Sequence, residues 1–455
     1  MSVETIFRWP VRIDVKKALI ALIVITAFVI GVALRLTMVL ETETGQQLHE
    51  GGDTTEYYSY AYNLIHHGVY SKQWPGINEE PVPDAKRSPG YPLFLTFFLS
   101  DSADSFDAIA KPVAIAQGLI SVITIFFAIG FFRGFLSWPW ACGAAMMVAI
   151  SPHLITINVN VMSESLFTFL LVVFCFCIRQ LAKRKTWQWA LLSGLAFGGA
   201  LLIRPTLQYF LVFLLPAFFV FFPRRDAIRF GILLIAGFML CYGPWMARNM
   251  ITPIAKSEFD FAAFSIQKGM YPGLMHNDDP RTYGFPNHFD PQFDQNKTMA
   301  SAVDEVFSRL RNEPMKYLQW FIIGKPSMLL SWGIVVGKGD IFIYPLRASP
   351  YQDNGVFRLT RELMLYIHWP VVILALLVAV FVWTGRSQSL LGDNGLIVAR
   401  FSSLVLAYFI LVHMAGTPLP RYAIPIKPVI YGLALLGLQL SFEAVRRYLR
   451  GRPAA

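Results

Sequence analysis

Two carboxylates stand close together at the start of the first long polar segment, and their residue type could do chemistry. Asp53 and Glu56 lie three positions apart in the stretch Gly-Asp-Thr-Thr-Glu-Tyr-Tyr-Ser-Tyr-Ala. A carboxylate can serve as a general base, but Asp at a helix N-cap with Glu three residues later also forms a capping box. Capping explains both residues without any catalysis. The spacing therefore leaves both interpretations open.

A third carboxylate, Glu164, stands at the edge of an apolar run. An ionisable residue there costs about 3 kcal/mol unless it is paired or hydrated, so Glu164 is a candidate functional residue. The alternative is a buried ion pair with Arg204 or Arg35 that fixes helix packing. For Arg35 itself the sequence favours snorkelling to lipid head groups. The pair Arg204-Pro205 is interpreted as an outer turn between two spans, where the arginine contacts head-group phosphates.

Histidines and cysteines give little sign of a metal site. None of the eight histidines forms an HExxH pair, and the four cysteines lie in apolar runs without a CxxC motif. The sequence therefore requires no cofactor. A divalent metal held by His66 or His67 with Glu56 remains an alternative, but a hydrogen-bonding role at the membrane interface is favoured for these histidines.

The elements that must position these residues are membrane helices. Of the 455 residues, 55% are hydrophobic and 15% are charged, against about 25% charged in soluble domains. Ten windows approach the length needed to cross the hydrocarbon core, which predicts an all-α polytopic membrane protein of about ten transmembrane helices. The windows are 18–40, 112–132, 138–155, 166–178, 187–203, 207–222, 230–245, 363–383, 396–415 and 423–442.

Basic residues alternate between the connecting loops and predict the orientation. With a cytoplasmic N-terminus, every loop predicted to lie inside carries Lys or Arg, as the positive-inside rule expects. Both termini are then cytoplasmic. The formal charge of +10 is explained by this topology, and the sequence predicts no nucleic-acid partner.

Two long polar segments, 41–111 and 249–361, are then expected to face outward. They divide the chain into an N-terminal transmembrane part (1–248), a large outer loop (249–361) and C-terminal transmembrane helices (362–455). An extra span at 317–336 would break the charge alternation, so that stretch is predicted to be an interfacial or re-entrant helix, broken at Lys325-Pro326. Residues 301–316 have helical periodicity and are expected to lie along the membrane surface.

Several short motifs, in order along the chain, resemble one family. Asp53 begins the pattern D-x-x-x-Y-x-x-x-A-x-N-L, and Lys86-Arg87 precede Ser-Pro-Gly-Tyr-Pro-Leu-Phe-Leu. Together they resemble the polyprenyl-phosphate-sugar-dependent transferases that include protein mannosyltransferases and the lipid A aminoarabinose transferase, with the C-type glycosyltransferase fold. The resemblance continues in Met-Ser-Glu-Ser-Leu (162–166), Gly-Leu-Ala-Phe-Gly (194–198), Leu-Ile-Arg-Pro (202–205), Gly-Pro-Trp-Met-Ala-Arg-Asn (243–249) and Pro-Arg-Tyr-Ala-Ile-Pro (420–425).

The resemblance implies a donor, an acceptor and a place in the cell. The donor is a polyprenyl-phosphate sugar, and the acceptor is a glycolipid, polysaccharide or protein reached at the outer face of a bacterial inner membrane. The anomeric centre is inverted by direct displacement. Membrane lipids are the other expected partners.

The resemblance also implies roles for individual residues. Asp53 matches the family's catalytic acid position and would take the acceptor proton, and Glu164 matches a second acid that is often Asp. Arginine suits a departing phosphate because its planar fork holds two oxygens. The candidate catalytic residues are Asp53, Glu164 and Glu56, the candidate donor-phosphate cations are Lys86, Arg87, Arg248 and Arg421, and the candidate pocket aromatics are Tyr57, Tyr91 and Tyr422.

Two other functions fit the same composition. A transporter or flippase for a lipid-linked sugar would use phosphate-binding cations without a base, but the sequence lacks the paired broken helices of two similar halves. A non-catalytic scaffold subunit would use the long outer loops as docking surfaces.

Overall fold

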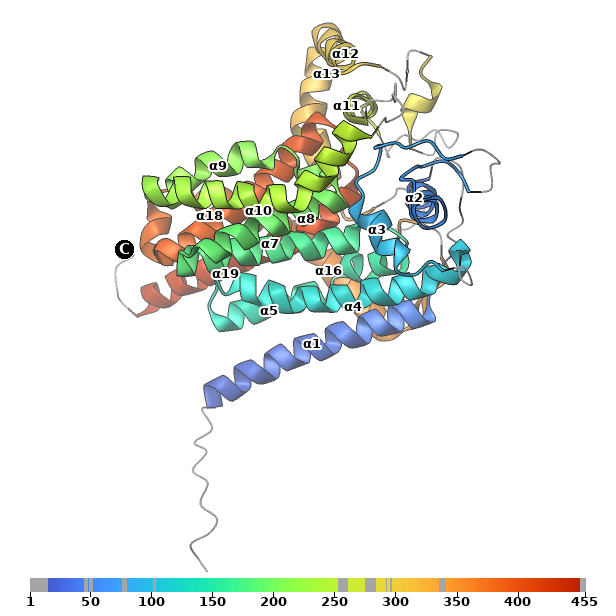
Figure 1. Cartoon of the computed structure of the whole chain (residues 1–455). Coiled ribbons are helices and arrows are strands. Elements are labelled where there is room, and N and C mark those ends of the chain that lie inside the picture. The colour runs from blue at the N-terminus through green and yellow to red at the C-terminus, as the bar shows by residue number, and fades with distance from the viewer. Residues whose placement is uncertain are drawn as a thin grey trace, which may run out of the picture.

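The computed structural model describes residues 15–44, 48, 52–75, 80–100, 104–252, 261–274, 284–291, 293–294, 297–334, 341–344 and 346–450. Long helices run side by side along one direction (Figure 1). The short helices α2 (Asp53–His67), α3 (Gly90–Thr96) and α11 (Phe261–Gly269) gather at one end of them (Figure 1). The chain enters α1 (Val15–Glu41) and leaves α19 (Lys427–Leu449) at the opposite end (Figure 1). The polar segments predicted to face outward therefore lie together, at the end of the bundle opposite to the start of α1 and the end of α19 (Figure 1).

Among the described residues, six helices have the length and composition to cross a membrane, and two bent pairs raise the number to as many as eight. Two shorter apolar helices, α8 and α9, complete the set. Each predicted window falls on one of these helices or pairs, which confirms the all-α membrane fold, but ten full spans are not confirmed. The six are α1 (Val15–Glu41), α4 (Phe106–Phe132), α7 (Glu164–Arg184), α10 (Arg224–Ile251), α18 (Arg386–Ala415) and η7 with α19 (Pro420–Ile426 and Lys427–Leu449).

The remaining apolar helices are bent or short. One pair bends by 52° between α5 and the short helices that follow it, and the other by 46° between α16 and α17. Each bent pair is either one broken span or a re-entrant loop. These helices are α5 (Trp138–Ile150), α6 (Pro152–Thr156), η2 (Ile157–Val159), α16 (Gly355–Tyr366), α17 (His368–Phe381), α8 (Trp187–Ile203) and α9 (Phe210–Phe221).

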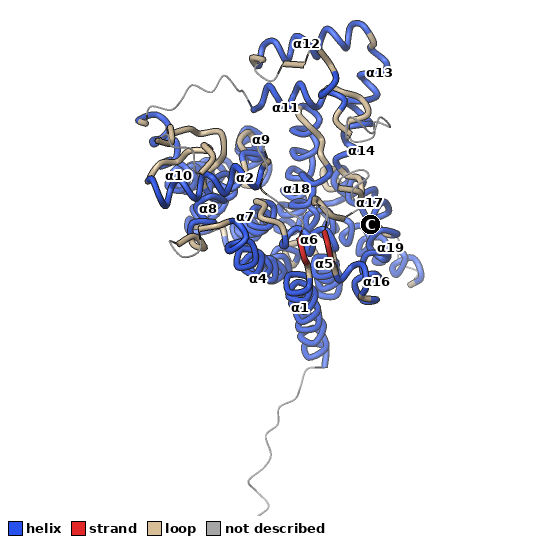
Figure 2. Tube along the Cα trace, turned by 90° about the vertical axis from the view of Figure 1, so that its right-hand side faces the viewer, coloured by secondary structure: helices blue, strands red, loops and turns tan. Residues whose placement is uncertain are grey.

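The outer segments contain short helices and one small sheet. Strand β1 (Glu43–Thr44) pairs antiparallel with β2 (Leu346–Ala348), which joins the two outer segments and adds a sheet that the sequence did not predict. The helices α11, α12 and α13 group together at one edge (Figure 2). The outer helices are α2 (Asp53–His67), α3 (Gly90–Thr96), η3 (Pro205–Leu207), α11 (Phe261–Gly269), η5 (Pro286–Phe289), α12 (Met299–Asn312), α13 (Pro314–Gln319), η6 (Trp320–Gly324), α14 (Lys325–Leu329) and α15 (Pro350–Asp353).

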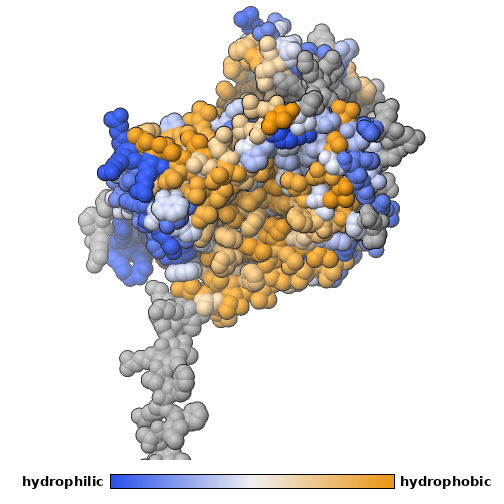
Figure 3. All heavy atoms as spheres, in the orientation of Figure 1, coloured by the Kyte–Doolittle hydropathy of each residue, from blue (hydrophilic) through white to orange (hydrophobic). Residues whose placement is uncertain are grey.

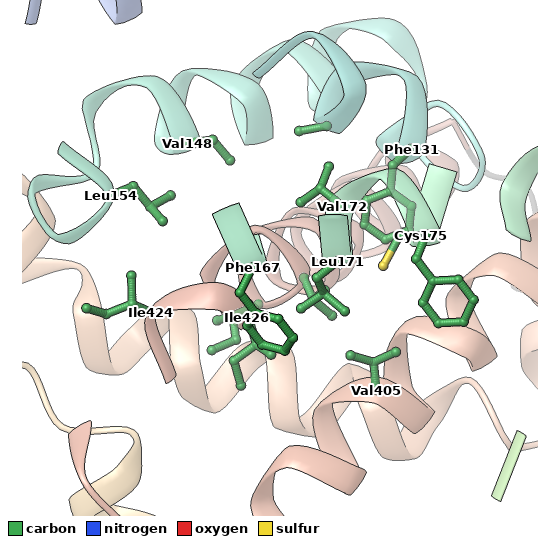
Figure 4. Packing of buried hydrophobic residues seen from close by; sticks show 14 of the residues in the cluster. Phe131, Val148, Leu154, Phe167, Leu171, Val172, Cys175, Val405, Ile424 and Ile426 are labelled. Atoms are coloured by element: carbon green, nitrogen blue, oxygen red, sulfur yellow. The ribbon is translucent and has the colours of Figure 1, made fainter. Parts of the chain in front are cut away.

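The surface and the core both suit a lipid environment. In Figure 3 the middle of the visible face is hydrophobic, and hydrophilic residues gather at its two ends. Inside, Phe167 and Leu171 of α7 pack toward Val405 of α18 and Ile424 of η7 (Figure 4). The helix that begins at Glu164 is therefore held between the N-terminal and C-terminal halves of the chain.

Arg35 does not snorkel to head groups, as the sequence favoured. Its side chain is buried, and Nε donates to Ser121 Oγ at 2.7 Å. The Nη atoms donate to the carbonyl oxygens of Ala149 (2.8 Å) and Val148 (3.1 Å). These carbonyls end α5 just before the bend at Pro152, where a proline cannot continue the hydrogen-bond ladder. Arg35 therefore stabilises the break in this span, because it satisfies acceptors that the bend leaves open.

The stretch predicted as an interfacial or re-entrant helix runs as α13, the π-helix η6 and α14, and it ends at Leu329. The expected break at Lys325-Pro326 is wrong, because the wider π-turn precedes Pro326 and makes room for its ring. Lys325 Nζ donates to the carbonyls of Met414 (2.8 Å) and Gly416 (2.9 Å), where α18 ends. The helix predicted at 301–316 corresponds to α12, which ends earlier, at Asn312.

Gly194 allows α8 and α10 to cross in contact, and its replacement is a test of the fold. A Cβ at position 194 would lie 2.0 Å from the Leu234 carbonyl oxygen, whereas one at Gly199 would meet only the Leu170 side chain at 3.6 Å. We expect Gly194→Ala to lower the free energy of unfolding by more than about 2 kcal/mol, since backbone must move, and Gly199→Ala to be nearly neutral. Thermal unfolding of the two purified variants in detergent measures this. Equal melting temperatures would contradict the close crossing.

Candidate active site

A cavity of about 270 Å³ lies where the outer segments meet the ends of the membrane helices. Asp53 and Tyr57 of α2 line one side, and Lys86 and Arg87 of the first outer segment lie beside them. The ends of α8 and α18, together with η7 and α11, complete the wall. Six of the ten predicted site residues line this cavity: Asp53, Tyr57, Lys86, Arg87, Arg421 and Tyr422.

Asp53 lies between two arginines. Its Oδ1 accepts a hydrogen bond from Arg87 Nη2 at 2.7 Å, and its Oδ2 accepts one from Arg421 Nη2. The three residues are far apart in sequence, and the fold of the whole chain brings them together. A bound anion would meet the same two guanidinium groups at this point of the wall.

Asp53 is not the N-cap of its helix, so the capping-box interpretation is wrong. Gly52 is the N-cap of α2 and makes no side-chain cap bond, while Asp53 is the first helical residue. The helix ends at Gly68, whose φ of 65° is the left-handed conformation that glycine adopts without strain. The carboxylates of Asp53 and Glu56 pair with cations of other segments and do not cap the backbone of α2.

Glu56 holds two cationic side chains of the first outer segment, Lys86 and Arg87. Its Oε1 accepts from Lys86 Nζ and its Oε2 accepts from Arg87 Nε, both at 2.5 Å. Arg87 therefore bridges Glu56 and Asp53. Glu56 is buried and does not line the cavity, so its position suits holding Arg87 rather than contacting a reactant.

The arginines determine the charge state of Asp53. Burial by itself would raise the pKa of Asp53, but the charges of Arg421 and Arg87 and their hydrogen bonds outweigh burial and hold the pKa well below its usual value of 3.8. Asp53 is therefore ionised, but it is a weak base while both arginines hold it.

Glu164 pairs with Arg204, as one interpretation of the sequence expected. Its Oε1 lies 2.5 Å from Arg204 Nη1, and the Glu164 side chain is fully buried at the start of α7. Arg204 lines the cavity and lies over the ring of Tyr422 at 5.2 Å. The prediction that Arg204 meets lipid head groups is therefore wrong: α8 does end before Pro205, but the side chain points to Glu164 and the cavity.

Of the three predicted aromatics, Tyr57 and Tyr422 line the cavity and Tyr91 does not. The ring of Tyr91 is fully buried, packs edge-on against Tyr57 at 4.9 Å, and donates through its hydroxyl to Gln117 Oε1 at 3.0 Å. Gln117 Nε2 in turn donates to the carbonyls of Asn158 (2.9 Å) and Asn160 (2.8 Å). Tyr91 supports Tyr57 from behind.

Arg248 also lies outside the cavity. Its Nη1 donates to the carbonyl oxygen of Asp84 at 2.8 Å, and its ring neighbours are Trp245 and Tyr70. The end of α10 that carries Arg248 therefore does not line this cavity.

Three further residues belong to or lie near the site. The sequence analysis did not predict His413 or Lys268, and it gave Arg204 a different role. His413 lines the cavity from α18, Arg204 does so from the end of α8, and Lys268 of α11 is close enough for its charge to interact with Arg421 and Asp53. Lys268 Nζ lies 4.4 Å from the ring centre of Phe285. Burial lowers the pKa of Lys268 to about 8, an effect to which Arg421 adds and which Asp53 opposes. No sequence motif identifies Lys268 as a site residue. In the structure its ammonium group lies beside an aromatic ring.

Within the described parts of the chain, no group of three or more His, Cys, Asp or Glu side chains is arranged to hold a metal ion. The alternative metal site would use His66 and Glu56. The Glu56 carboxylate is already paired with Lys86 and Arg87, and the ring centre of His66 lies 4.2 Å from that of Tyr62.

Comparison with known proteins gives a family for part of the chain. Residues 86–246 match the family model described as dolichyl-phosphate-mannose-protein mannosyltransferase. A search of curated proteins by sequence found no match.

Two solved structures are among those that match the chain. One is the archaeal oligosaccharyltransferase AglB from Archaeoglobus fulgidus in complex with an inhibitory peptide and a dolichol-phosphate (14% identity, TM-score 0.49, 97% of this chain and 52% of that chain). The other is ArnT from Cupriavidus metallidurans bound to undecaprenyl phosphate (14% identity, TM-score 0.40, 95% of this chain and 79% of that chain). The chain spans about half the length of the archaeal structures it matches.

The matched segment carries much of the site and of the motifs. It begins at Lys86 and includes Arg87, Glu164 and Arg204. The resemblance to the polyprenyl-phosphate-sugar-dependent glycosyltransferases is therefore confirmed by the mannosyltransferase family model over residues 86–246 of this chain.

Proposed function

We propose that this protein transfers a sugar from a polyprenyl-phosphate donor to a hydroxyl of a glycolipid, polysaccharide or protein acceptor, with inversion, at the extracytoplasmic face. The observation that carries the proposal is the carboxylate of Asp53 on the wall of the cavity, held between Arg87 and Arg421. A base and two fixed cations at one point are what a displacement at a phosphate-linked carbon needs.

The cavity has a place for each part of such a donor. Lys86, Arg87, Arg204 and Arg421 supply positive charge where the phosphate leaves. Ile203, Ile266 and Val412 supply apolar surface in the same cavity, which suits the first units of an isoprenoid chain. Tyr57 and Tyr422 offer rings and hydroxyls to the sugar.

Donor binding would also make Asp53 a better base. A phosphate that accepts hydrogen bonds from Arg87 and Arg421 competes with Asp53 for the same N–H groups. As the arginines turn to the phosphate, the interactions that depress the pKa of Asp53 weaken, and its carboxylate can take the acceptor proton. The acceptor oxygen then attacks the anomeric carbon, the bond to the phosphate oxygen breaks, and the phosphate leaves on the arginines.

The orientation of the site is part of this proposal. The chain enters α1 and leaves α19 at the end of the bundle opposite to α2 (Figure 1). Arg184, Arg225 and Arg447 belong to the end of α7, the start of α10 and the end of α19. These positions and the positive-inside rule support the proposal that both termini are cytoplasmic and that the cavity faces outward, in a bacterial inner membrane.

A transfer assay tests the function directly. The purified full chain in detergent is incubated with a panel of polyprenyl-phosphate sugars and an extract of cell-envelope glycolipids, polysaccharides and proteins, and sugar-labelled products are identified. We expect one donor to be consumed with formation of a labelled acceptor. A flippase or a scaffold would leave every donor intact in detergent, and that result would overturn the proposal.

The charge of Lys268 predicts a pH dependence of donor use. Lys268 is protonated below its pKa of about 8 and loses its charge above it, while a phosphodiester donor keeps its charge throughout. We expect the KM for the donor to rise about fivefold between pH 7 and pH 9.5 as this attraction is lost. In Lys268→Arg the cation persists, so the rise should disappear; an equal rise in both proteins would contradict the role of Lys268.

A further inference from the structure

The motif that ends α10 belongs to a second cavity. This cavity, of about 540 Å³, is called the side groove here, and it lies between the end of α10, the end of α8, the end of α2 and helix α3. Leu64, Tyr70, Leu93, Leu202, Trp245 and Arg248 are among its lining residues. The segment 83–89 separates it from the first cavity, because Pro83 and Pro89 line the side groove while Lys86, Arg87 and Ser88 line the other.

The surroundings of the side groove are suited to hydrocarbon. Leu93 of α3 is 44% exposed, Phe97 at the C-cap of α3 is 84% exposed, and Met250 of α10 is 85% exposed. Apolar side chains exposed to this degree at the end of a membrane-spanning helix meet lipid rather than water. An occupant of the groove is therefore expected to enter from the surrounding lipid with an apolar chain.

Arg248 places an uncompensated positive charge at this groove. Its Nη1 donates to Asp84 O (2.8 Å) and Asn249 Oδ1 (3.0 Å), and its Nη2 donates to Tyr70 O at 3.4 Å. All three acceptors are neutral, and among the described residues no carboxylate lies within ion-pair distance of Arg248. The Nε–H and one N–H of Nη2 remain for an acceptor that also carries negative charge.

The contacts of Arg248 lead to the cations of the first cavity. Asp84 accepts from the Lys86 amide at 3.0 Å through Oδ1, and the Tyr70 hydroxyl donates to the Arg87 carbonyl at 3.1 Å. Tyr70 also stacks on Tyr60 at 4.2 Å, and the Tyr60 hydroxyl donates to Asp84. Any contact that fixes Arg248 therefore also fixes the segment that presents Lys86 and Arg87.

We infer that the side groove binds an anionic membrane phospholipid, with one acyl chain along Leu93, Leu202 and Trp245 and its phosphate on Arg248. The bound lipid is not a reactant. Its phosphate neutralises the charge of Arg248, and its acyl chain fills the groove. The bound lipid therefore restricts the movement of the segment 83–89 from the side opposite to the donor cavity. Only the consequence for donor binding rests on the proposed function; the lipid site itself does not.

The lipid site is tested without donor or acceptor. The full chain is reconstituted with phosphatidylglycerol that carries a photoreactive group on one acyl chain, and the crosslinked peptides are mapped. We expect crosslinks in 64–93 and 241–252, reduced about tenfold in Arg248→Gln, since a charge-assisted hydrogen bond contributes about 1.5 kcal/mol. Arg358→Gln, which removes an exposed arginine of α16, is the matched control and should crosslink like the native protein.

A second variant separates the groove from the charge. Leu93→Trp fills the groove without touching Arg248, and it should reduce the crosslinks by a similar factor. Crosslinks that are equal in the native protein, Arg248→Gln and Leu93→Trp would overturn the proposal, as would complete displacement of the label by polyprenyl phosphate, which would make the groove a donor site. Loss of lipid in Arg248→Gln with no glycosyl transfer by any protein would refute the proposed function and leave the lipid site standing.

Discussion

An Asp53→Asn variant is expected to lose glycosyl transfer by a factor of about 10² to 10⁴, the usual contribution of a general base. Asn keeps the shape of the side chain and one hydrogen-bond acceptor, but it cannot take the acceptor proton. Asp53 also holds Arg87 and Arg421, and the loss of its charge leaves both arginines free for the donor phosphate. Donor binding should therefore stay within a few-fold of the native value or become tighter, while kcat falls.

The measurement is kcat and donor affinity, determined separately on purified protein. Asp107→Asn is the matched control, because Asp107 lies in the first turn of α4, is exposed, and has no part in the cavity. If Asp53→Asn kept native kcat, Asp53 would not be the base. A loss confined to the donor KM would instead assign Asp53 to positioning the arginines, and a misfolded variant would be recognised by its melting temperature.

The architecture was accessible from the sequence because lipid constrains it so strongly. Each apolar window predicted a helix that exists, since every backbone polar group in hydrocarbon must be paired within its own helix. Lengths were harder to predict. The window 112–132 began at its proline, but α4 begins at Phe106, where the Ser105 side chain caps the helix and Pro112 is accommodated within the helix. Hydropathy alone placed the start of this helix too late, and the capping side chain of Ser105 marks where it begins.

The site was only partly accessible, because its contacts join distant segments. Residue type and motif order pointed to Asp53, Arg87 and Arg421, yet nothing local shows that Arg421 reaches Asp53 across 368 positions. The same limit explains the errors. An Asp and a Glu three residues apart satisfy the capping-box rule, but stronger cations from elsewhere engaged both carboxylates.

The partners of arginines near predicted helix ends could not be read from the sequence. Arg35 and Arg204 were both predicted to contact lipid head groups, because that is the usual place of an arginine at the end of a span. In the structure Arg35 pairs with open carbonyls at a helix bend, and Arg204 pairs with Glu164. Which partner an arginine finds depends on the bend of α5 and on the packing of α7 against α8, and neither is visible in residue spacing.

Arg421→Gln is expected to lower kcat by a factor of about 10² to 10³, because a fixed donor lost from the point where charge develops has an effect of this size. Arg421 contacts Asp53 and lines the cavity, so it is the cation placed best to receive the leaving phosphate. Arg421→Lys should recover only part of the rate, since an ammonium group cannot hold two oxygens in one plane. Arg446→Gln, at the far end of α19, is the control and should have native activity.

The same substitution tests whether Asp53 and Arg421 act together. Without Arg421, Asp53 keeps only Arg87, so the pKa of Asp53 should rise toward its ordinary value and the acid limb of the pH–rate profile should move to higher pH. The double variant Asp53→Asn with Arg421→Gln should then lose little more activity than Asp53→Asn alone, because residues that work as a unit have non-additive effects. Losses that multiply, with an unchanged acid limb, would show that Arg421 acts on the phosphate independently of Asp53, and the exchange of arginines between the carboxylate and the phosphate would be refuted.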